Sequence, residues 1–149
     1  MRINFWKVIQ VKEASCNYPA LDKRIRTPQD VYRILRDVLK LHEEASEKFG
    51  IVNLNTKNAV TGIHIISQGT LDSTLVHPRE VYKAAMLNNA SSIILFHNHP
   101  SQEVVASNED IMMTKRLKEA GDLLGISVLD HIIVGDERFC SLKELGMLC

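Results

Sequence analysis

Residues 91–100 have the sequence SSIILFHNHP, and the fold can be worked out from this stretch. Residues 91–96 contain no charged side chain and are mostly apolar, which is typical of a central strand buried on both faces of a sheet. His97 and His99 follow at the end of this strand, and Pro100, which lacks an N–H, helps to terminate it. The stretch therefore predicts a buried central strand whose end carries two imidazoles.

Helices and strands alternate on either side of this strand. Thr27 can cap a helix that has Pro28 at its first position, and Asp30 suits its positively polarised first turn. Gly125 is well placed just past the end of a long helix. The predicted helices cover residues 27–46, 78–89, 108–124 and 142–148, and the predicted strands cover residues 3–12, 49–55, 60–67, 91–96 and 128–134. Residues 56–58 are turn-like, so the second and third strands should form a hairpin. This mixture predicts one α/β sandwich around a mixed sheet.

The composition is that of an ordinary globular domain. The 149 residues are 45% hydrophobic and 24% charged, which fits one domain and argues against disorder. The formal net charge is zero, so no basic excess favours binding to nucleic acid phosphates. No apolar run approaches the roughly 18–20 residues of a membrane span, and no signal-peptide pattern is present. We therefore expect a cytoplasmic chain, and reduced thiols at Cys16, Cys140 and Cys149, whose spacing forms no motif.

The two histidines have the spacing of metal ligands. In an extended strand, residues i and i+2 point to the same side, and their Cα atoms lie roughly 6.5–7 Å apart. Two imidazoles at that separation can converge on one ion at about 2.0–2.1 Å each. A sheet end is also where open α/β folds place their ligands. The alternative is that each histidine is an ordinary packed polar side chain that binds no metal.

Asp110 is the third candidate ligand. On the predicted helix over 108–124 it shares a stripe with Thr114, Leu117, Gly121 and Leu124, which should face the sheet. A carboxylate that points inward needs a partner, and a metal ion would supply one. Two histidines, one carboxylate and a water form a catalytic zinc arrangement. Alternatively, Ser107 and Asp110 simply begin the helix, as N-cap and as an acidic residue in its first turn.

The region from His97 to Asp110, with Ser107 three residues before the aspartate, resembles the JAMM motif of MPN-domain metallopeptidases. The surrounding motifs are similar to one bacterial branch, the RadC family. They are Gly69-Thr70-Leu71, His77-Pro78-Arg79-Glu80-Val81, His97-Asn98-His99-Pro100-Ser101, Glu109-Asp110, Thr114-Lys115-Arg116-Leu117 and Asp130-His131-Ile132-Ile133-Val134-Gly135. The resemblance covers about residues 28–148. It departs from the family pattern in the loop after Pro100, where Gln102 replaces a glycine and Ala106 precedes Ser107.

The resemblance implies a fold. It is a single MPN/JAMM-like α/β (α+β) sandwich over residues 1–149, with a mixed sheet flanked by helices and cytidine-deaminase-like layering. Residues 1–26 match less well and are expected to form a strand and a loop. RadC-like proteins often carry an additional N-terminal helix-hairpin-helix region, and this chain looks like the short form with the JAMM domain alone.

The resemblance also implies roles for individual residues. His97, His99 and Asp110 would hold Zn²⁺, and Ser107 would donate a hydrogen bond to the oxyanion of the intermediate. The general base in JAMM enzymes is a glutamate near the junction of the first long helix and a strand. Glu47 fits that position best, Glu43 and Glu44 lie close by in sequence, and Glu80 is the second choice. Asp130 and His131 either support the ligands or form a structural polar pair.

The function that the resemblance implies is hydrolysis of an amide bond in a peptide or isopeptide-linked substrate by a zinc-activated water. Two alternatives are a DNA-repair-associated accessory domain, which the zero net charge does not favour, and a zinc-bearing scaffold with little activity. The same ligands would also serve a phosphodiesterase, and imidazole suits iron, manganese and nickel as well as zinc. The oligomeric state stays open, a homodimer being one alternative, and no membrane partner is expected.

Overall fold

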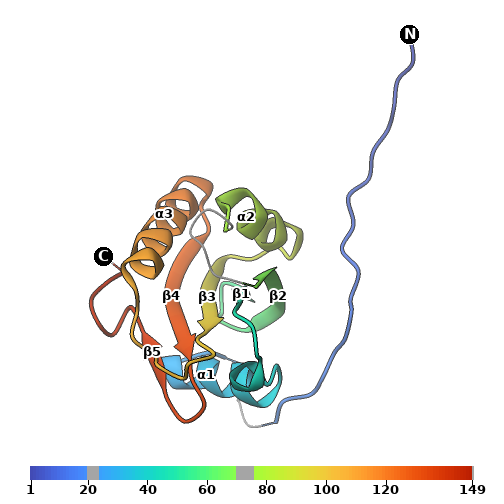
Figure 1. The fold of residues 1–149 in the computed structure, drawn as a ribbon. Helices are drawn as coiled ribbons and strands as arrows, with labels where there is room; N and C mark the ends of the chain where they lie inside the picture. Colours follow the sequence, from blue (N-terminus) through green and yellow to red (C-terminus); the bar gives the residue numbers. More distant parts are fainter. Residues whose placement is uncertain (20–23, 70–75, 149) are drawn as a thin grey trace.

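A mixed β-sheet forms the centre of the computed structural model, which describes residues 1–19, 24–69 and 76–148. In these ranges the sheet has five strands in the order β2-β1-β3-β4-β5 (Figure 1). Their bounds are β1 (Lys48–Leu54), β2 (Val60–Gln68), β3 (Ser92–Asn98), β4 (Ser127–Val134) and β5 (Phe139–Ser141). Strands β3 and β4 are parallel, and the other neighbours are antiparallel. The predicted α/β class with a mixed sheet is confirmed.

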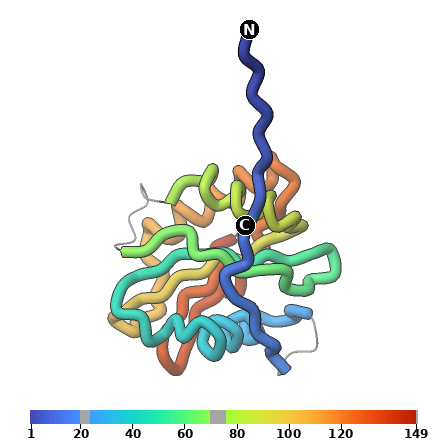
Figure 2. The backbone as a smooth tube through the Cα atoms, turned by 90° about the vertical axis from the view of Figure 1, so that its right-hand side faces the viewer, coloured from blue at the N-terminus to red at the C-terminus, as the bar shows by residue number. Residues whose placement is uncertain are grey.

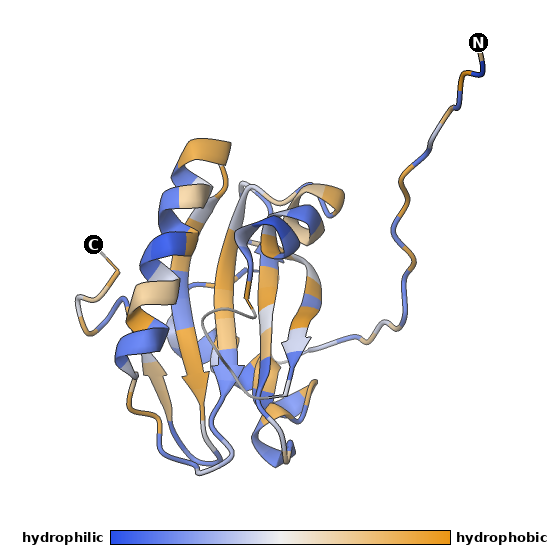
Figure 3. Cartoon of the chain, turned by 45° about the horizontal axis from the view of Figure 1, so that its top comes forward, coloured by the Kyte–Doolittle hydropathy of each residue, from blue (hydrophilic) through white to orange (hydrophobic). Residues whose placement is uncertain are grey.

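Helices cover both faces of this sheet. Helices α2 (Pro78–Leu87) and α3 (Asn108–Leu124) lie on one face, and α1 (Pro28–Asp37) lies on the other. All seven residues of β3 are buried, because its odd-numbered side chains pack toward α2 and α3 and its even-numbered ones toward α1. Figure 3 shows the long hydrophobic stretches in the central strands that result. Along the described residues, no helix has both the length and the apolar character that crossing a bilayer requires.

The predicted hairpin is present. Strands β1 and β2 pair antiparallel, and both lie within about one residue of the expected bounds. Gly69 follows β2 with a φ of 114°, a backbone conformation that favours glycine. Thr70 and Leu71, which belong to one of the quoted motifs, lie outside the described residues.

The first helix is shorter than predicted. It begins at Pro28 behind a capping box formed by Thr27 and Asp30, as expected, but it ends at Asp37 rather than near residue 46. Lys40 then adopts a left-handed conformation with a φ of 52°, and a short 3₁₀ helix, η1, covers Leu41–Glu43. Leu41 is 1% exposed and packs in the core on the α1 side. Burial of Leu41 against the sheet therefore outweighs continuation of the helical periodicity.

The strand predicted over residues 3–12 is wrong. Residues 1–18 form no helix or strand, and the chain runs away from the body (Figure 1). A strand needs a neighbour that completes its backbone hydrogen bonds, and no described strand pairs with this segment. The alternating pattern is real, but the single chain offers it no partner in this structure.

The helix predicted over residues 142–148 is also wrong. The Leu142 N–H donates to the carbonyl of His131, which continues the pairing of β4 with the short strand β5. Gly146 then takes a φ of 73°, and the chain forms turns. The three residues of β5 were missed because a strand of that length carries too little periodicity to detect. The prediction of free thiols holds for Cys16 and Cys140, and Cys149 lies outside the described residues.

Gly121 marks the closest approach of α3 to its neighbours. A Cβ atom added there would collide with the carbonyl oxygen of Ile126 and with the hydroxyl of Tyr82. We expect Gly121→Ala to lower the free energy of unfolding by about 1–3 kcal/mol through overpacking, although alanine improves helix propensity by about 1 kcal/mol. Urea unfolding measures the change. Glu119→Ala, at an exposed position of the same helix, should stay within about 0.5 kcal/mol, and equal stability of both variants would contradict the prediction.

Candidate metal centre

Three elements bring the predicted ligands to one point. His97 is in β3, His99 lies just beyond that strand, and Asp110 is in the first turn of α3. One ligand atom from each of the three residues lies within 4.8 Å of the others, and the group could hold a metal ion. His97 and Asp110 are 0% and 2% exposed, whereas the His99 side chain is 16% exposed. Solvent therefore reaches the cluster from the side of His99.

The distances fit a single small ion. The Nε2 atoms of His97 and His99 are 2.9 Å apart. The Asp110 carboxylate oxygens lie 3.4 Å from Nε2 of His97 and 3.6 Å from Nε2 of His99. Atoms bound tetrahedrally at the zinc distances of about 2.0–2.1 Å are about 3.3–3.4 Å from one another. The three measured separations fall close to that value on either side, so the three residues fit around one zinc ion.

A chain of hydrogen bonds orients His97. It starts at the Asp110 carbonyl, which can only accept, so the Thr114 hydroxyl donates to it at 2.6 Å. The Thr114 oxygen is then an acceptor for Nδ1–H of His131, also at 2.6 Å. Because His131 is fully buried, burial holds its pKa well below the ordinary value and keeps the ring neutral. Its Nε2 therefore accepts from Nδ1–H of His97 at 2.7 Å. In the neutral ring this leaves the Nε2 lone pair of His97 facing Asp110.

His99 is oriented by a shorter route to the same result. Its Nδ1 lies 2.6 Å from the carbonyl oxygen of Glu103, which can only accept, so the proton is on Nδ1. Its Nε2 therefore points at the cluster as a potential ligand. Two lone pairs and one carboxylate converge, and such a set repels itself unless a cation lies among them.

The electrostatics of the cluster agree with an anionic centre. Burial opposes ionisation of Asp110, but the neighbouring imidazoles of His97 and His99 and the hydrogen bond from the Ser107 N–H outweigh it and hold the carboxyl pKa well below its usual range. The neighbouring Asp110 carboxylate raises the pKa of His99. Asp110 is therefore a carboxylate throughout the neutral range, as a ligand of a divalent cation needs to be.

Ser107 is the N-cap of α3, so the structural reading of this residue is correct. Its Oγ accepts from the Asp110 N–H at 3.1 Å, and the Asp110 carboxylate accepts from the Ser107 N–H at 2.8 Å. This capping box fixes the carboxylate beside the histidines. A hydroxyl that accepts one bond still has a proton to donate, so capping leaves the predicted donor role of Ser107 available.

Glu47 lies next to the cluster. Phe49 pairs with His97 across β1 and β3, and extending that antiparallel register places Glu47 opposite His99 on the same face of the sheet. The charge of Glu47 contributes to the raised pKa of His99. Asn98 holds this segment in place, because its side chain accepts from the Lys48 N–H at 2.7 Å and donates to the Ser46 carbonyl at 3.1 Å.

The other glutamate candidates interact with neighbours in their own segments. Glu44 pairs with Lys48 at 2.7 Å, and Glu43 is exposed and lies 3.5 Å from His42. Glu80 is exposed on α2, where its hydrogen bond with Lys83 lowers its pKa. These contacts favour Glu47 over the three alternatives.

Asp130 and His131 point to opposite faces of β4, so they do not act together. The Asp130 carboxylate accepts from the hydroxyl of Ser141 at 2.6 Å and from the backbone N–H groups of His131 and Lys143 at 2.7 and 3.1 Å. Burial raises its pKa. These bonds join β4 to Ser141 of β5 and to Lys143 just after it, so Asp130 has a structural role, whereas His131 supports His97.

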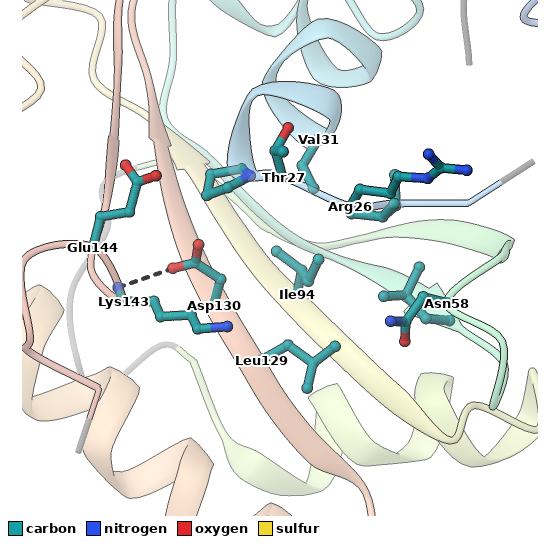
Figure 4. A pocket seen from close by; sticks show the side chains of 12 residues that line it. Arg26, Thr27, Val31, Asn58, Ile94, Leu129, Asp130, Lys143 and Glu144 are labelled. Carbon is teal, nitrogen blue, oxygen red and sulfur yellow. Dashed lines mark hydrogen bonds between the residues drawn. The ribbon is translucent and has the colours of Figure 1, made fainter. Parts of the chain in front are cut away.

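A cavity of about 400 Å³ lies beside Asp130 on the α1 face, and Figure 4 shows its lining. Its walls are Ile25, Arg26, Thr27, Pro28, Val31, Leu54, Asn58, Ile94, Leu129, Asp130, Lys143 and Glu144. None of these residues belongs to the His97, His99 and Asp110 cluster. The candidate metal centre is therefore separate from this cavity and lies on the opposite face of the sheet.

Thr114 and the Glu103 carbonyl were missed as contributors to the site. Thr114 was expected only as part of the inward stripe, and nothing in the residue pattern points to a backbone carbonyl. The position of Thr114 one helical turn after Asp110 was the available signal, because threonine can bond to the carbonyl four residues earlier.

The hydrogen bond between His131 and His97 makes a measurable prediction. We expect His131→Ala to weaken metal binding by about 10–100-fold, the usual effect of removing a partner that orients a metal ligand. Competition with a chromophoric chelator measures the affinity. His64→Ala, which removes a histidine of β2 that bonds to Asn53 and is not part of the cluster, should leave the affinity unchanged. Equal affinities in both variants would contradict this role of His131.

Comparison with known proteins gives one consistent family. Residues 25–147 match the family described as RadC-like JAB domain. The chain is 53% identical over 124 residues to a UPF0758 protein of Moorella thermoacetica, which covers 83% of this chain and 53% of the relative. A UPF0758 protein of Desulfitobacterium hafniense is 48% identical over 130 residues, covering 87% and 56%. One of Methanosarcina mazei is 45% identical over 126 residues, covering 85% and 54%. The chain spans about half the length of these relatives.

Proposed function

The chain belongs to the family of RadC-like JAB domains, and we propose that it is a Zn²⁺-dependent hydrolase of amide bonds in peptide or isopeptide-linked substrates. His97, His99 and Asp110 would hold the ion, which leaves a fourth position for water, as in catalytic zinc sites. When bound there, Zn²⁺ polarises a substrate carbonyl and lowers the pKa of water toward about 7.

One observation carries the proposal. Nδ1–H of His97 donates a hydrogen bond to His131, and Nδ1–H of His99 donates one to the Glu103 carbonyl. The Nε2 atoms of both histidines therefore face the Asp110 carboxylate. A purely structural polar cluster would need donors facing acceptors. When both rings are neutral the centre contains acceptors alone, which suits a metal cation.

The remaining residues supply the proton transfers and the charge stabilisation. Glu47 takes the proton from the attacking water and delivers it to the leaving amine. The Ser107 hydroxyl donates to the oxyanion of the tetrahedral intermediate. The substrate carbonyl would approach from the side of His99, because the rest of the cluster is buried.

The proposed function is tested on the whole chain with mixed peptides and with peptides joined through a lysine side-chain amide. We expect the Zn²⁺-loaded chain to cleave at least one class, with the activity lost on treatment with 1,10-phenanthroline and restored by added Zn²⁺. Mass spectrometry of the products identifies the bond. A folded chain with a full complement of zinc that cleaves neither class would contradict the proposal and favour a scaffold role.

A further inference from the structure

Residues 3–11 form an extended arm whose apolar side chains are unpacked. Figures 1 and 2 show the arm leaving the body of the protein. Its apolar side chains are between 64% and 93% exposed: Ile3, Phe5, Trp6, Val8, Ile9 and Val11. Contiguous apolar surface of this kind marks an interaction site in a soluble protein.

The arm has the pattern of a β-strand whose odd-numbered face is the more apolar, while Trp6 and Val8 point to the other face. Ile3, Phe5, Ile9 and Val11 stand at alternate positions, with only Lys7 between them on that face. Figure 3 shows hydrophobic and hydrophilic residues alternating along the arm. The pattern that predicted a strand here is therefore intact, and the backbone is already extended.

Strand β2 is the complementary surface. It is an edge of the sheet, so half of its backbone groups point away from β1. Within the described residues, none of the backbone bonds formed outside the strands involves residues 61–68. Val60 and Ile65 are 38% and 45% exposed. Both lie on the same face of β2 as Ile63. The partners of Val60, Ile63 and Ile65 on β1 are Leu54, Val52 and Gly50, which alternate along that strand.

Length distinguishes β2 from the other edge of the sheet. Strand β2 has nine residues, the same length as the arm, whereas β5 has three. The exposed apolar row of β2 also continues the α1-side core, against which Ile63 packs. An arm strand with its apolar face on this side would extend that core by one strand.

The arm is presented away from its own β2. Asn88 donates to Gln10 at 3.4 Å and accepts from the hydroxyl of Thr61 in β2 at 2.7 Å, so the end of the arm lies near the start of β2, and the preceding residues run outward (Figure 2). A second copy can receive such an arm, and exchange of identical elements is a low-cost route to a two-fold dimer. On the face that is buried, the Phe5 side chains of two arms together offer roughly 300–500 Å² of surface, to which Ile3, Ile9 and Val11 of each arm add, toward what a specific interface needs.

We propose that the arm of one copy pairs with the β2 edge of a second copy as a sixth strand, so that the chain forms a homodimer by reciprocal arm exchange. The backbone hydrogen bonds of β2 provide the affinity, and the apolar row of the arm against Val60, Ile63 and Ile65 fixes which face is buried. The proposal concerns a surface separate from the candidate metal centre and does not depend on it.

The test uses the full chain over a range of concentrations, with light scattering to give the mass and hydrogen exchange to locate the interface. We expect a dimer, with the amides of residues 3–11 and of β2 protected together as the concentration rises. Phe5→Asp should weaken dimerisation roughly tenfold or more, since it places a charge in the buried row. Asn4→Asp, one residue away on the opposite face, adds a negative charge and should leave the dimer intact.

Three results would overturn the proposal. The first is a chain that stays monomeric at every concentration with an unprotected arm. The second is a monomer whose arm is protected, which would mean that the arm folds onto its own β2. The third is a dimer that persists unchanged in Phe5→Asp, which would place the interface elsewhere. Neither variant alters a residue packed in the body, so loss of folding does not confuse the outcome.

Discussion

Glu47→Gln should retain its metal and lose about 10²–10⁴-fold in turnover, the usual contribution of a general base. Glutamine has nearly the same shape, but its amide cannot take a proton from water. Extending the β1–β3 register places Glu47 opposite His99, and after Asp110 its charge contributes to the raised pKa of that histidine. The rate constant for cleavage of the best substrate, measured on zinc-loaded protein, gives the effect.

The matched control is Glu44→Gln. Glu44 is three residues earlier on the same segment and pairs with Lys48 rather than with the cluster. Its replacement should change turnover by no more than a few-fold, because the partly buried Glu44–Lys48 pair does not contact the cluster. Normal turnover in Glu47→Gln, with both variants fully loaded, would show that the base is another group.

Asp110→Asn should reduce metal affinity by more than the roughly 10–100-fold expected for loss of an orienting partner. The asparagine side chain keeps an oxygen that can accept from the Ser107 N–H, so the start of α3 is preserved. It removes the negative charge that the two histidines face. Chelator competition gives the affinity, and circular dichroism shows that the helix is intact.

The matched control for this variant is Asp122→Asn. Asp122 is an exposed aspartate on α3 that pairs with Lys118. The Asp122→Asn variant should bind the metal as tightly as the unaltered chain does. Full affinity in Asp110→Asn would show that the carboxylate is a helix cap and no more.

The histidine pair and Asp110 could be predicted because each follows from local periodicity. The i, i+2 spacing puts His97 and His99 on one side of a strand end, and the helical stripe turns Asp110 inward. The same stripe failed at Leu124, which is 45% exposed, because α3 ends at that residue. Glu47 came from family resemblance alone, since its position depends on the register between β1 and β3.

The errors share a physical cause. Residues 3–12 alternate as a strand does, yet pairing is a property of two segments and cannot be read from one. The first helix ends before Leu41 because Leu41 packs in the core, a tertiary contact that cannot be predicted from helical periodicity. Asp130 and His131 are adjacent and polar, which suggests a pair, but alternation along β4 points their side chains to opposite faces of the sheet. The chain of bonds through Thr114 needed the packing of α3 on β4, which only the structure supplies.

The most direct test of the metal centre is elemental analysis of the chain purified without chelator or affinity tag, alongside His99→Ala. The account predicts about one zinc per chain for the unaltered protein and almost none for the variant. A full equivalent retained by His99→Ala would contradict the ligand assignment. A folded, unaltered chain that contains no metal and takes up none when zinc is added would contradict the metal centre itself.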